Sequence, residues 1–492
     1  MSLIQISNLT FAYEGSYDTI FDEVSFQIET EWRLGFIGRN GRGKTTFFNL
    51  LMGKYPFQGT ISASAEFEYF PYEVSDKNQN TIDIADCLCP DCPLWQLQRE
   101  LSLLDVSEDV LYRPFSTLSN GEQSKVLLAV LFLKQNYFLL IDEPTNHLDE
   151  KARGIVGKYL SSKKGFILVS HDRQFLDSCV DHILSINKNN IEIQKGNFSS
   201  WWENKRMQDE FELSEHEKLQ KDIKKLAAAA KRTEAWSKQA EKAKKNTRNS
   251  GLRPDRGYVG HKAAKVMKRS KNIEARQENA INEKSKLLKN LDTAEDLSVQ
   301  PLPYHTDQFI EASDLSIFYG SRKICGPLRF TVNQGERVAL KGKNGCGKSS
   351  LLKCVMGEDI SYTGNLRIGT KLIISYVSQD TAFLHGNLKE FAEHSQIEES
   401  LFKAILRKLD FTRQQFEKDM ADFSEGQKKK VLIAKSLCEH AHLYIWDEPL
   451  NFIDVLSRMQ IEKLILAHCP TMIFVEHDRT FSDRVATKII EL

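Results

Sequence analysis

The feature that most constrains this chain is an internal repeat. Four short motifs from its first 200 residues return in the last 190 at an almost constant offset. GRNGRGKT begins at residue 38 and GKNGCGKS at residue 342, an offset of 304. The serines of LSNGEQ and FSEGQ are offset by 305 residues, and so are the Asp-Glu pairs of FLLIDE and LYIWDE. The histidines of ILVSHDR and IFVEHDR follow at 306. Because chance matches do not stay in register, the chain is an internal duplication of one unit.

Each copy has the pattern of an α/β domain. Apolar runs at 33–37, 138–141 and 166–169 suit buried parallel strands, and 337–340, 443–446 and 472–475 are their counterparts. Alternating segments at 3–9 and 25–28 suggest a smaller antiparallel sheet. We therefore expect an α/β fold with two P-loop nucleotide-binding domains, at residues 1–200 and 307–492, joined by residues 201–306.

The joining segment predicts two antiparallel helices. Residues 201–292 lack strand patterning and are rich in Glu, Lys, Gln and Ala, except at 246–260, where three glycines and one proline break the pattern. This is typical of a helical hairpin with its tip near 246–260.

The two glycine-rich motifs have the context of a P-loop, because each follows a strand and opens a helix. Glycine lets backbone N–H groups wrap phosphates. Lys44 and Lys348 are placed to reach the β- and γ-phosphates of ATP, and the hydroxyls of Thr45 and Ser349 to ligate Mg²⁺.

The acidic pairs end apolar strands, as metal-binding and water-activating carboxylates of an ATPase should. Asp142 and Asp447 are candidate holders of the metal's water shell, and Glu143 and Glu448 are candidate general bases. An acidic pair that merely caps a turn is the alternative. His171 and His477 follow the next apolar strands, where a lone histidine is usually structural. Both stand 28 or 29 residues after their glutamates, however, and this matched spacing favours a contact to the γ-phosphate.

LSNGEQ and FSEGQ resemble the signature motif of ABC-type ATPases, which contacts ATP bound to the opposite unit. The resemblance covers residues 1–200 and 307–492 and implies a head-to-tail sandwich within one chain, and hence a monomer. Tyr13 and Tyr319 match the family's adenine-stacking aromatic residue. The nucleotide-binding residues implied by motif and resemblance together are Tyr13, Gly38, Asn40, Gly41, Gly43, Lys44, Thr45, Thr46, Ser119, Gly121, Tyr319, Gly342, Asn344, Gly345, Gly347, Lys348, Ser349, Ser350, Gln379, Ser424 and Gly426. The implied metal ligands are Thr45, Asp142, Ser349, Gln379 and Asp447.

The copies depart from the family pattern in two places. The family's glutamine is present as Gln379, but Tyr72 stands there in the first copy, and FSEGQ has Phe423 and Glu425 where the family has Leu and Gly. We therefore expect the two ATP sites to be unequal.

The joining segment is strongly basic although the whole chain has a formal net charge of zero. Between residues 218 and 276 there are 19 Lys or Arg against 5 Asp or Glu, an excess of 14. Such a patch is the electrostatic signature of a nucleic-acid ligand, and Tyr258 could stack on an RNA base. The alternative is a solvated face of a charged coiled coil. The candidate RNA-binding residues are Lys244, Lys245, Arg248, Arg253, Arg256, Tyr258, Lys262, Lys265, Lys268 and Arg269.

Two ATPase units, no predicted membrane span and a basic linker resemble the F type of ABC proteins, which act in translation. The tract SGLRPDRGYVGHKAAKVMKRSKNIEARQ resembles the Lsa-type antibiotic-resistance proteins. This implies binding at the exit site of the bacterial ribosome, with rRNA and exit-site tRNA as partners, and displacement of lincosamides, streptogramin A and pleuromutilins. The alternatives are a housekeeping translation factor of the same type, the ATPase of a drug exporter, and a DNA-tethering ATPase.

Spacing favours the resistance interpretation over the housekeeping one. From Tyr72 to Leu118 is 46 residues and from Gln379 to Phe423 is 44, so the first copy lacks the extra arm found in many housekeeping relatives.

The chain opens without a secretory signal, so its nine cysteines are expected to be free thiols of a cytosolic protein. Cys87, Cys89 and Cys92 in CLCPDC could ligate zinc, but structural zinc wants four ligands and no His or Cys follows within twenty residues.

Overall fold

The computed structural model describes residues 3–13, 19–134, 136–146, 148–186, 191–212, 298–343 and 345–492, with single positions between 214 and 276. The chain divides into two compact units. One contains Met1–Ser199 together with Ala294–Leu492, and the other is Ser200–Thr293. The two ATPase halves are therefore parts of the same unit.

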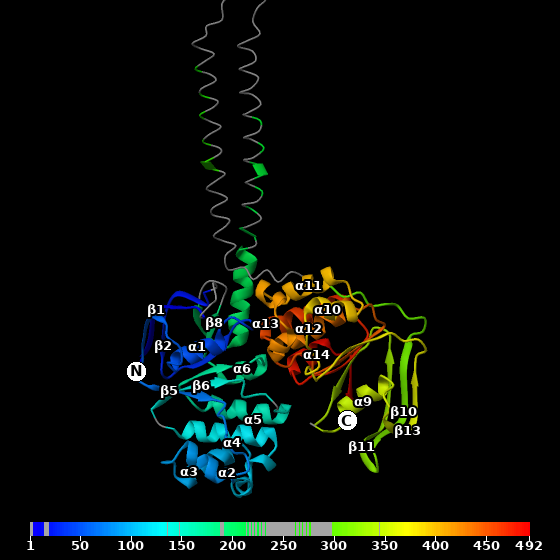
Figure 1. Cartoon of the computed structure of the whole chain (residues 1–492), viewed down its shortest axis with the longest axis horizontal. Coiled ribbons are helices and arrows are strands. Elements are labelled where there is room, and N and C mark those ends of the chain that lie inside the picture. Colours follow the sequence, from blue (N-terminus) through cyan, green and yellow to red (C-terminus); the bar gives the residue numbers. More distant parts are fainter. Residues whose placement is uncertain are drawn as a thin grey trace, which may run out of the picture. The chain divides into compact units, whose positions relative to one another are not determined.

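The first half contains a three-stranded antiparallel sheet and a six-stranded sheet (Figure 1). The small sheet has the order β2-β1-β4, and the large one β5-β6-β7-β3-β8-β9, which is parallel except for the last pair. The strands are β1 (Leu3–Phe11), β2 (Phe21–Glu29), β3 (Arg33–Ile37), β4 (Gln58–Ser62), β5 (Glu66–Phe70), β6 (Tyr137–Asp142), β7 (Phe166–Val169), β8 (His182–Ile186) and β9 (Ile191–Lys195).

The helices of the first half fall into two groups. The helix α1 follows β3 directly, and α2, α3 and α4 gather into a helical subdomain (Figure 1). The helices are α1 (Lys44–Leu51), α2 (Thr81–Leu88), α3 (Leu94–Leu103), α4 (Asn120–Leu133), α5 (Glu150–Ser161) and α6 (Arg173–Cys179), with short 3-10 turns η1 (Glu108–Tyr112) and η2 (Phe115–Thr117).

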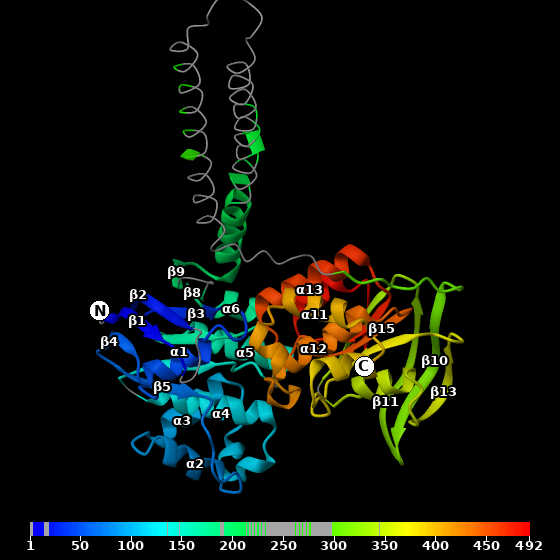
Figure 2. The same ribbon diagram turned by 45° about the horizontal axis from the view of Figure 1, so that its top comes forward.

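The second half repeats this plan. An antiparallel sheet has the order β11-β10-β13, and its strands lie side by side in both Figure 1 and Figure 2. The parallel sheet has the order β14-β15-β16-β12-β17. The strands are β10 (Gln308–Tyr319), β11 (Arg322–Asn333), β12 (Arg337–Lys341), β13 (Ser361–Ile368), β14 (Ile374–Val377), β15 (Leu443–Asp447), β16 (Met472–Val475) and β17 (Lys488–Glu491).

The helices of the second half match those of the first in order. They are α9 (Lys348–Val355), α10 (Leu388–His394), α11 (Glu399–Lys408), α12 (Glu425–Cys438), α13 (Val455–His468) and α14 (Arg479–Val485), with the 3-10 turns η3 (Arg413–Glu417) and η4 (Met420–Asp422). The predicted α/β fold with a duplicated nucleotide-binding domain is confirmed.

Apolar side chains hold each pair of sheets around its P-loop helix. Phe47 and Phe48 of α1 are fully buried and pack with Phe36 of β3 and Phe21 of β2. In the second half α9 buries its leucines in a cluster that also holds strands of both sheets. Because each P-loop lies between a buried strand and a buried helix, its backbone is held in place by burial.

The second unit is helical wherever it is described. Residues 200–212 are helical without a break, as are the single described positions between 214 and 232 and between 261 and 276. The expected tip at 246–260 lies outside the described residues. In the part of the chain that the structure describes, no helix is both long and apolar enough to cross a bilayer.

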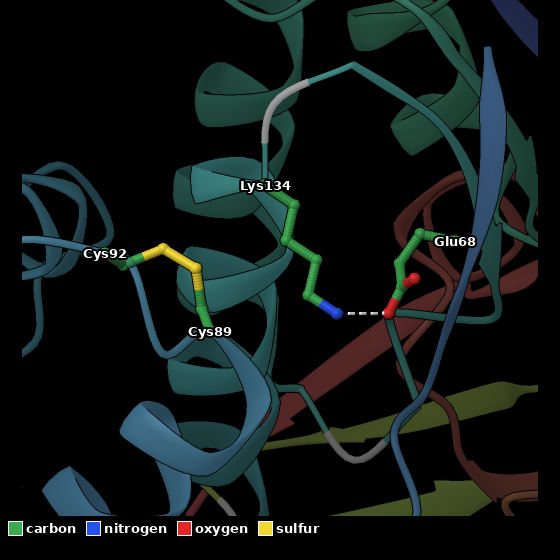
Figure 3. The surroundings of a disulfide bond; sticks show 4 residues. All are labelled: Glu68, Cys89, Cys92 and Lys134. Carbon is green, nitrogen blue, oxygen red and sulfur yellow. Dashed lines mark hydrogen bonds and ion pairs between the residues drawn. A yellow bond between two sulfur atoms is a disulfide. The ribbon is translucent and has the colours of Figure 1, made fainter.

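The expectation that all cysteines are free thiols is wrong for one pair. Cys89, at the end of α2, and Cys92, just before α3, form a disulfide (Figure 3). These two residues are three apart, so the connection between the helices is short enough to bring their sulfurs together. Cys87 stays free and exposed, and no metal-holding group of three or more His, Cys, Asp or Glu occurs among the described residues.

In the same view an ion pair joins α4 to the large sheet. The ammonium of Lys134, at the end of α4, lies 2.6 Å from Oε1 of Glu68 on β5 (Figure 3). It connects the helical subdomain to the sheet beside Tyr72, whose ring lies 5.1 Å from the same ammonium.

A buried ion pair links the two ATPase halves. Arg173 of α6 contacts Glu462 of α13 at 2.6 Å, and each side chain is only 6% exposed. The second carboxylate oxygen of Glu462 accepts from Arg484 at 2.8 Å. A second ion pair joins Arg479 of the second half to Glu150 of the first at 3.3 Å, and both of its side chains are more than half exposed.

We therefore expect Glu462→Gln to destabilise the ATPase unit far more than Glu150→Gln. Removing one partner of a buried pair leaves a buried charge and costs about 3–5 kcal/mol, whereas exposed pairs contribute about 0–1 kcal/mol. Differential scanning calorimetry without ATP should show a clearly lower unfolding temperature for Glu462→Gln alone. Equal shifts for the two variants would contradict the importance of this contact.

Candidate functional site: two ATP sites

The first ATP site is the P-loop at residues 38–45 with the groups around it. The backbone of Gly41 and Gly43 has φ of 83° and 92°, a left-handed conformation that glycine adopts at low cost. This turn brings Lys44 to the first position of α1, where its ammonium donates to the carbonyl oxygens of Gly38 at 2.7 Å and Arg39 at 3.2 Å. Burial lowers the pKa of Lys44.

The hydroxyl of Thr45 donates to Oδ2 of Asp142 at 3.2 Å, across the gap between α1 and the end of β6. Tyr69 donates to the same oxygen at 3.2 Å. Burial raises the pKa of Asp142 above its usual range. Carboxylate and hydroxyl oxygens suit Mg²⁺, which is commonly bound by one or two protein ligands together with substrate phosphates, so this pair of residues fits the predicted ion.

Glu143 follows Asp142 in a left-handed backbone conformation, with φ of 49°. Its N–H donates to the carbonyl of Val169 on β7, and its Oε1 lies 3.3 Å from Nε2 of His171. Burial, and next the charge of Asp142, raise the pKa of Glu143 to about 8. Burial also lowers the pKa of His171 well below its ordinary value.

The second ATP site repeats the geometry around the P-loop at 342–349. Lys348 donates to the carbonyl oxygens of Gly342 at 2.9 Å and Lys343 at 3.0 Å, and Gly345 and Gly347 are left-handed. Asp447 is 2% exposed, and burial raises its pKa although a hydrogen bond from Ser349 opposes the shift. Asn344 lies outside the described residues.

Glu448 has more partners than its counterpart in the first site. Its Oε2 accepts from Gln379 at 2.9 Å and from Asn451 at 2.6 Å, and its Oε1 lies 3.2 Å from Nε2 of His477. Burial alone favours the neutral acid, but His477 and the nearby lysines Lys429 and Lys348 lower the pKa of Glu448. The predicted inequality of the sites is thus visible in the surroundings of the two glutamates.

The two glutamates should therefore affect stability with opposite signs. The pKa of Glu143 in the folded protein is about 8, above its ordinary value of 4.5, so folding favours the protonated carboxyl. The stability that the protonated carboxyl contributes is complete below pH 4.5 and is lost as the pH rises through 8. We expect Glu143→Gln to stabilise the ATP-free protein increasingly between pH 5 and 8, by up to a few kcal/mol.

Glu448→Gln is the matched control. The pKa of Glu448 is lowered in the folded protein, so folding favours the ionised carboxylate. The stability that this carboxylate contributes is present above its ordinary pKa and is lost as the pH falls through its lowered pKa. This variant should lower stability at pH 7. Thermal unfolding of both variants across this range is the measurement, and shifts of the same sign at pH 8 would contradict the described surroundings.

The tyrosines expected to stack on adenine lie near the start of each P-loop helix. Tyr13 and Thr46 share a hydrogen bond of 2.8 Å, and Ser350 donates to Tyr319 at 3.4 Å. Tyr13 and Tyr319 are 41% and 52% exposed, so a ligand can reach both residues.

The signature residues begin α4 and α12. Ser119 and Ser424 cap these helices through capping boxes with Glu122 and Gln427. A helix N-terminus carries unpaired N–H groups and a positive partial charge, which suit a phosphate.

The structure brings the P-loop of each half to the signature of the other. One cavity of about 830 Å³ is lined by Ser119 and Gly121 from the first half and by Lys348, Ser349 and Glu448 from the second. At the first site the halves touch directly. The amide of Asn40 donates to the carbonyl of Phe452 at 2.7 Å, and a Cβ on Gly426 would lie 2.8 Å from Asn40 Nδ2.

Motif reading missed several residues that the structure places at these sites. Asp454 accepts from the backbone N–H of Asn40 at 3.3 Å and from the buried Lys430 at 2.9 Å, and Arg153 donates to the carbonyl of His477 across the halves at 3.2 Å. The repeat itself contained the signal, because Asp149/Asp454, Asn146/Asn451 and Arg153/Arg458 all stand 305 residues apart.

Two of the candidate RNA-binding residues lie in the described part of the chain. Lys265 and Lys268 are exposed and helical. The others lie outside the described residues: Lys244, Lys245, Arg248, Arg253, Arg256, Tyr258, Lys262 and Arg269.

The sequence profile of the ABC transporter family matches residues 21–146 and again 325–451, which together are more than half of the chain. The chain belongs to the ABC transporter family. It is an ATPase, and its predicted place among the F-type ABC proteins is confirmed by relatives that match along almost its whole length.

Among these relatives, the ribosome protection protein VmlR of Bacillus subtilis is 28% identical, over 98% of this chain and 85% of its own length. The energy-dependent translational throttle protein EttA of Haemophilus influenzae is 25% identical, over 96% and 89%. A similar solved structure is that of the archaeal ribosome recycling factor aABCE1 in complex with the stalk protein aP1. It has a TM-score of 0.63 and 17% identity, over 98% of this chain and 87% of that one. At that identity the likeness concerns the fold of this ABC ATPase.

Proposed function

We propose that this ABC ATPase binds the bacterial ribosome in the cytoplasm and protects it from drugs that act at the peptidyl-transferase centre. The observation that carries the proposal is the pairing of each P-loop with the other half's signature inside one chain. Two ATP molecules can therefore close the halves of a monomer, as a factor acting alone on a ribosome requires. The similarity to a ribosome protection protein along 98% of the chain supports the choice of target.

The chemistry assigned to each site follows from its geometry. Lys44 and Lys348 hold the β- and γ-phosphates once ATP replaces their present backbone partners. Glu143 and Glu448 accept a proton from the attacking water, and His171 and His477 orient these carboxylates and contact the γ-phosphate. Thr45 with Asp142, and Ser349 with Asp447 and Gln379, would hold Mg²⁺, which would neutralise charge at the phosphates.

ATP closure fixes the relation between the halves, and the hairpin that joins them responds to it. In this mechanism the closed protein binds the ribosome at its exit site, next to the tRNA there, and hydrolysis releases it. ATP acts as a ligand that favours one of two states. The basic residues of the hairpin, among them the exposed Lys265 and Lys268, neutralise rRNA phosphates.

The drugs displaced by the hairpin tip are lincosamides, streptogramin A and pleuromutilins in this proposal. The runner-up is a housekeeping translation factor, which the similarity to a translational throttle protein favours. The spacing between Tyr72 and Leu118, without an added arm, favours the protection role. An exporter ATPase leaves the basic hairpin without a purpose.

The test is sedimentation of the Glu143→Gln/Glu448→Gln double variant through sucrose with purified ribosomes. With ATP the variant should travel with the ribosomes, and with ADP it should stay at the top of the gradient. A variant that stays at the top with both nucleotides, while still binding ATP, would overturn the ribosome as the target.

A further inference from the structure

The helix α12 contacts the loop after β14 in a way that the first half does not repeat. That loop, residues 378–381, carries Gln379, which donates to the carboxylate of Glu448. Lys429 lies on α12, five residues after Ser424. Its ammonium donates to the carbonyl of Ser378 at 2.9 Å. Glu425, at the first position of α12, accepts from the hydroxyl of Thr381.

Lys429 is an unusual side chain to bury. It is 2% exposed, and it lines a cavity that Gln379 and Glu448 also line. Burying a cation is costly unless it is paired and hydrogen-bonded. The carbonyl of Ser378 and the neighbouring carboxylates supply that compensation, which holds the loop to the helix.

The first half has an open space at the same place. By the offset of 305, Asn120 and Ser124 of α4 correspond to Glu425 and Lys429. Ser124 donates to the carbonyl of Asn120 within its own helix. Between α4 and the loop that carries Tyr72 there is a cavity of about 520 Å³, lined by Asn120 and Ser124 from the helix and by Tyr72 and Val74 from the loop.

The helix α12 also serves the other ATP site. Its N-terminus meets the first P-loop, because Gly426 packs against Asn40. The helix α12 therefore contacts the phosphate loop of the first site at its start. It contacts loop 378–381 of the second site there too, through Glu425, and one turn later through Lys429. The corresponding helix of the first half, α4, faces the second site. Among the described residues its Asn120 and Ser124 donate no hydrogen bond to the loop that carries Tyr72, which α4 contacts only at its other end, through Lys134.

We infer that Lys429 and Glu425 are positioning residues that transmit closure of the first ATP site to the second. When α12 moves onto ATP at the first site, the loop moves with it, and Gln379 brings Glu448 into line for its own water. The transmission has one direction, since the signature end of α4 makes no hydrogen bond to the equivalent loop among the described residues, and the ring of Tyr72 contacts Lys134 at the far end of that helix instead. This inference rests on the proposed pairing of the two ATP sites.

The test measures turnover at one site at a time. Glu143→Gln leaves the second site to hydrolyse ATP, and Glu448→Gln leaves the first. In the Glu143→Gln protein, Lys429→Ser should lower kcat by roughly tenfold to a hundredfold with little change in KM for ATP, because it misplaces a group that acts on the chemical step. In the Glu448→Gln protein the same substitution should leave turnover nearly unchanged.

The comparison separates positioning from support of the helix. If Lys429 only kept α12 folded, its loss would misplace Ser424 and slow the first site as well. Equal losses in both backgrounds, or no loss at the second site, would overturn the inference. Lys429→Arg should restore most of the lost kcat, because it keeps a cationic donor.

A second variant covers the case in which Lys429→Ser does not fold. Thr381→Val removes the donor to Glu425 at nearly constant volume and should lower kcat at the second site in the same way, though less. An unchanged kcat in this variant together with an insoluble Lys429→Ser protein counts against the inference. If Glu143→Gln and Glu448→Gln each leave total turnover at the wild-type rate, the site assignments themselves are wrong, and this is seen before any change at Lys429.

Discussion

Replacing Glu143 and Glu448 together by glutamine is expected to lower ATP turnover by roughly 10²–10⁴-fold while ATP binding persists. Each carboxylate stands at the end of a buried strand, directly after the candidate metal-binding aspartate and within 3.3 Å of a histidine. Glutamine keeps the shape but cannot accept the proton of the attacking water. Phosphate release at saturating ATP and equilibrium binding of labelled ATP measure the two halves of this expectation.

The single variants are the controls for this expectation. Each should keep one working site, and their remaining rates need not be equal, because Glu448 is hydrogen-bonded by Gln379 and Asn451 whereas Tyr72 replaces the glutamine in the first half. A double variant that hydrolyses ATP at a rate close to the wild type would show that neither glutamate is the general base.

Neutralising the basic hairpin should produce the second large effect, a collapse of ribosome affinity at low salt. Ten candidate residues lie between 244 and 269, nine of them cationic. A protein that makes 6–10 phosphate contacts loses about 10³–10⁵ in affinity between 50 and 200 mM salt. Replacing the nine Lys and Arg by Gln should therefore weaken binding strongly at 50 mM salt and flatten its salt dependence.

Tyr258→Ala, with all charges kept, is the matched comparison. Loss of a stacking contact should weaken binding by about 1–3 kcal/mol without changing the salt slope. Fluorescence anisotropy of the labelled protein titrated with ribosomes, at several salt concentrations, gives both quantities. If the affinity for ribosomes depends on salt concentration equally before and after the charges are removed, the basic residues do not bind rRNA phosphates and the hairpin is a solvated spacer.

Much of the fold could be predicted because the buried parallel strands are short, continuous runs of apolar residues. The segments 33–37, 166–169 and 472–475 match β3, β7 and β16 to the residue. The edge strand β9 was not predicted, since its side chains are only half-buried and its pattern is mixed. The disulfide between Cys89 and Cys92 was not predicted either, because the pairing of two cysteines depends on where the ends of two helices meet and not on composition.

The candidate sites were predictable where chemistry demands a residue type at a fixed spacing. Lys44, Asp142 and Glu143 are recognisable for this reason. Residues that act through tertiary contacts carry no such pattern. Lys429 looks like one of three consecutive lysines in the sequence, and only its burial beside Gln379 and Glu448 distinguishes it. Asp454 stands out in the sequence only as the repeat partner of Asp149, and its contact with Asn40 is shown only by the structure.

The most direct test of the proposed role is the drug susceptibility of a sensitive bacterium that expresses this chain. Two strains are compared with an empty-vector strain, one carrying the full chain and one a chain in which residues 250–260 are shortened to a minimal turn. The full chain should raise the inhibitory concentration of a lincosamide, and the shortened chain should not, although its purified form hydrolyses ATP at the wild-type rate. Equal resistance from both chains, or none from the full chain at matched expression, would contradict ribosome protection by the hairpin tip.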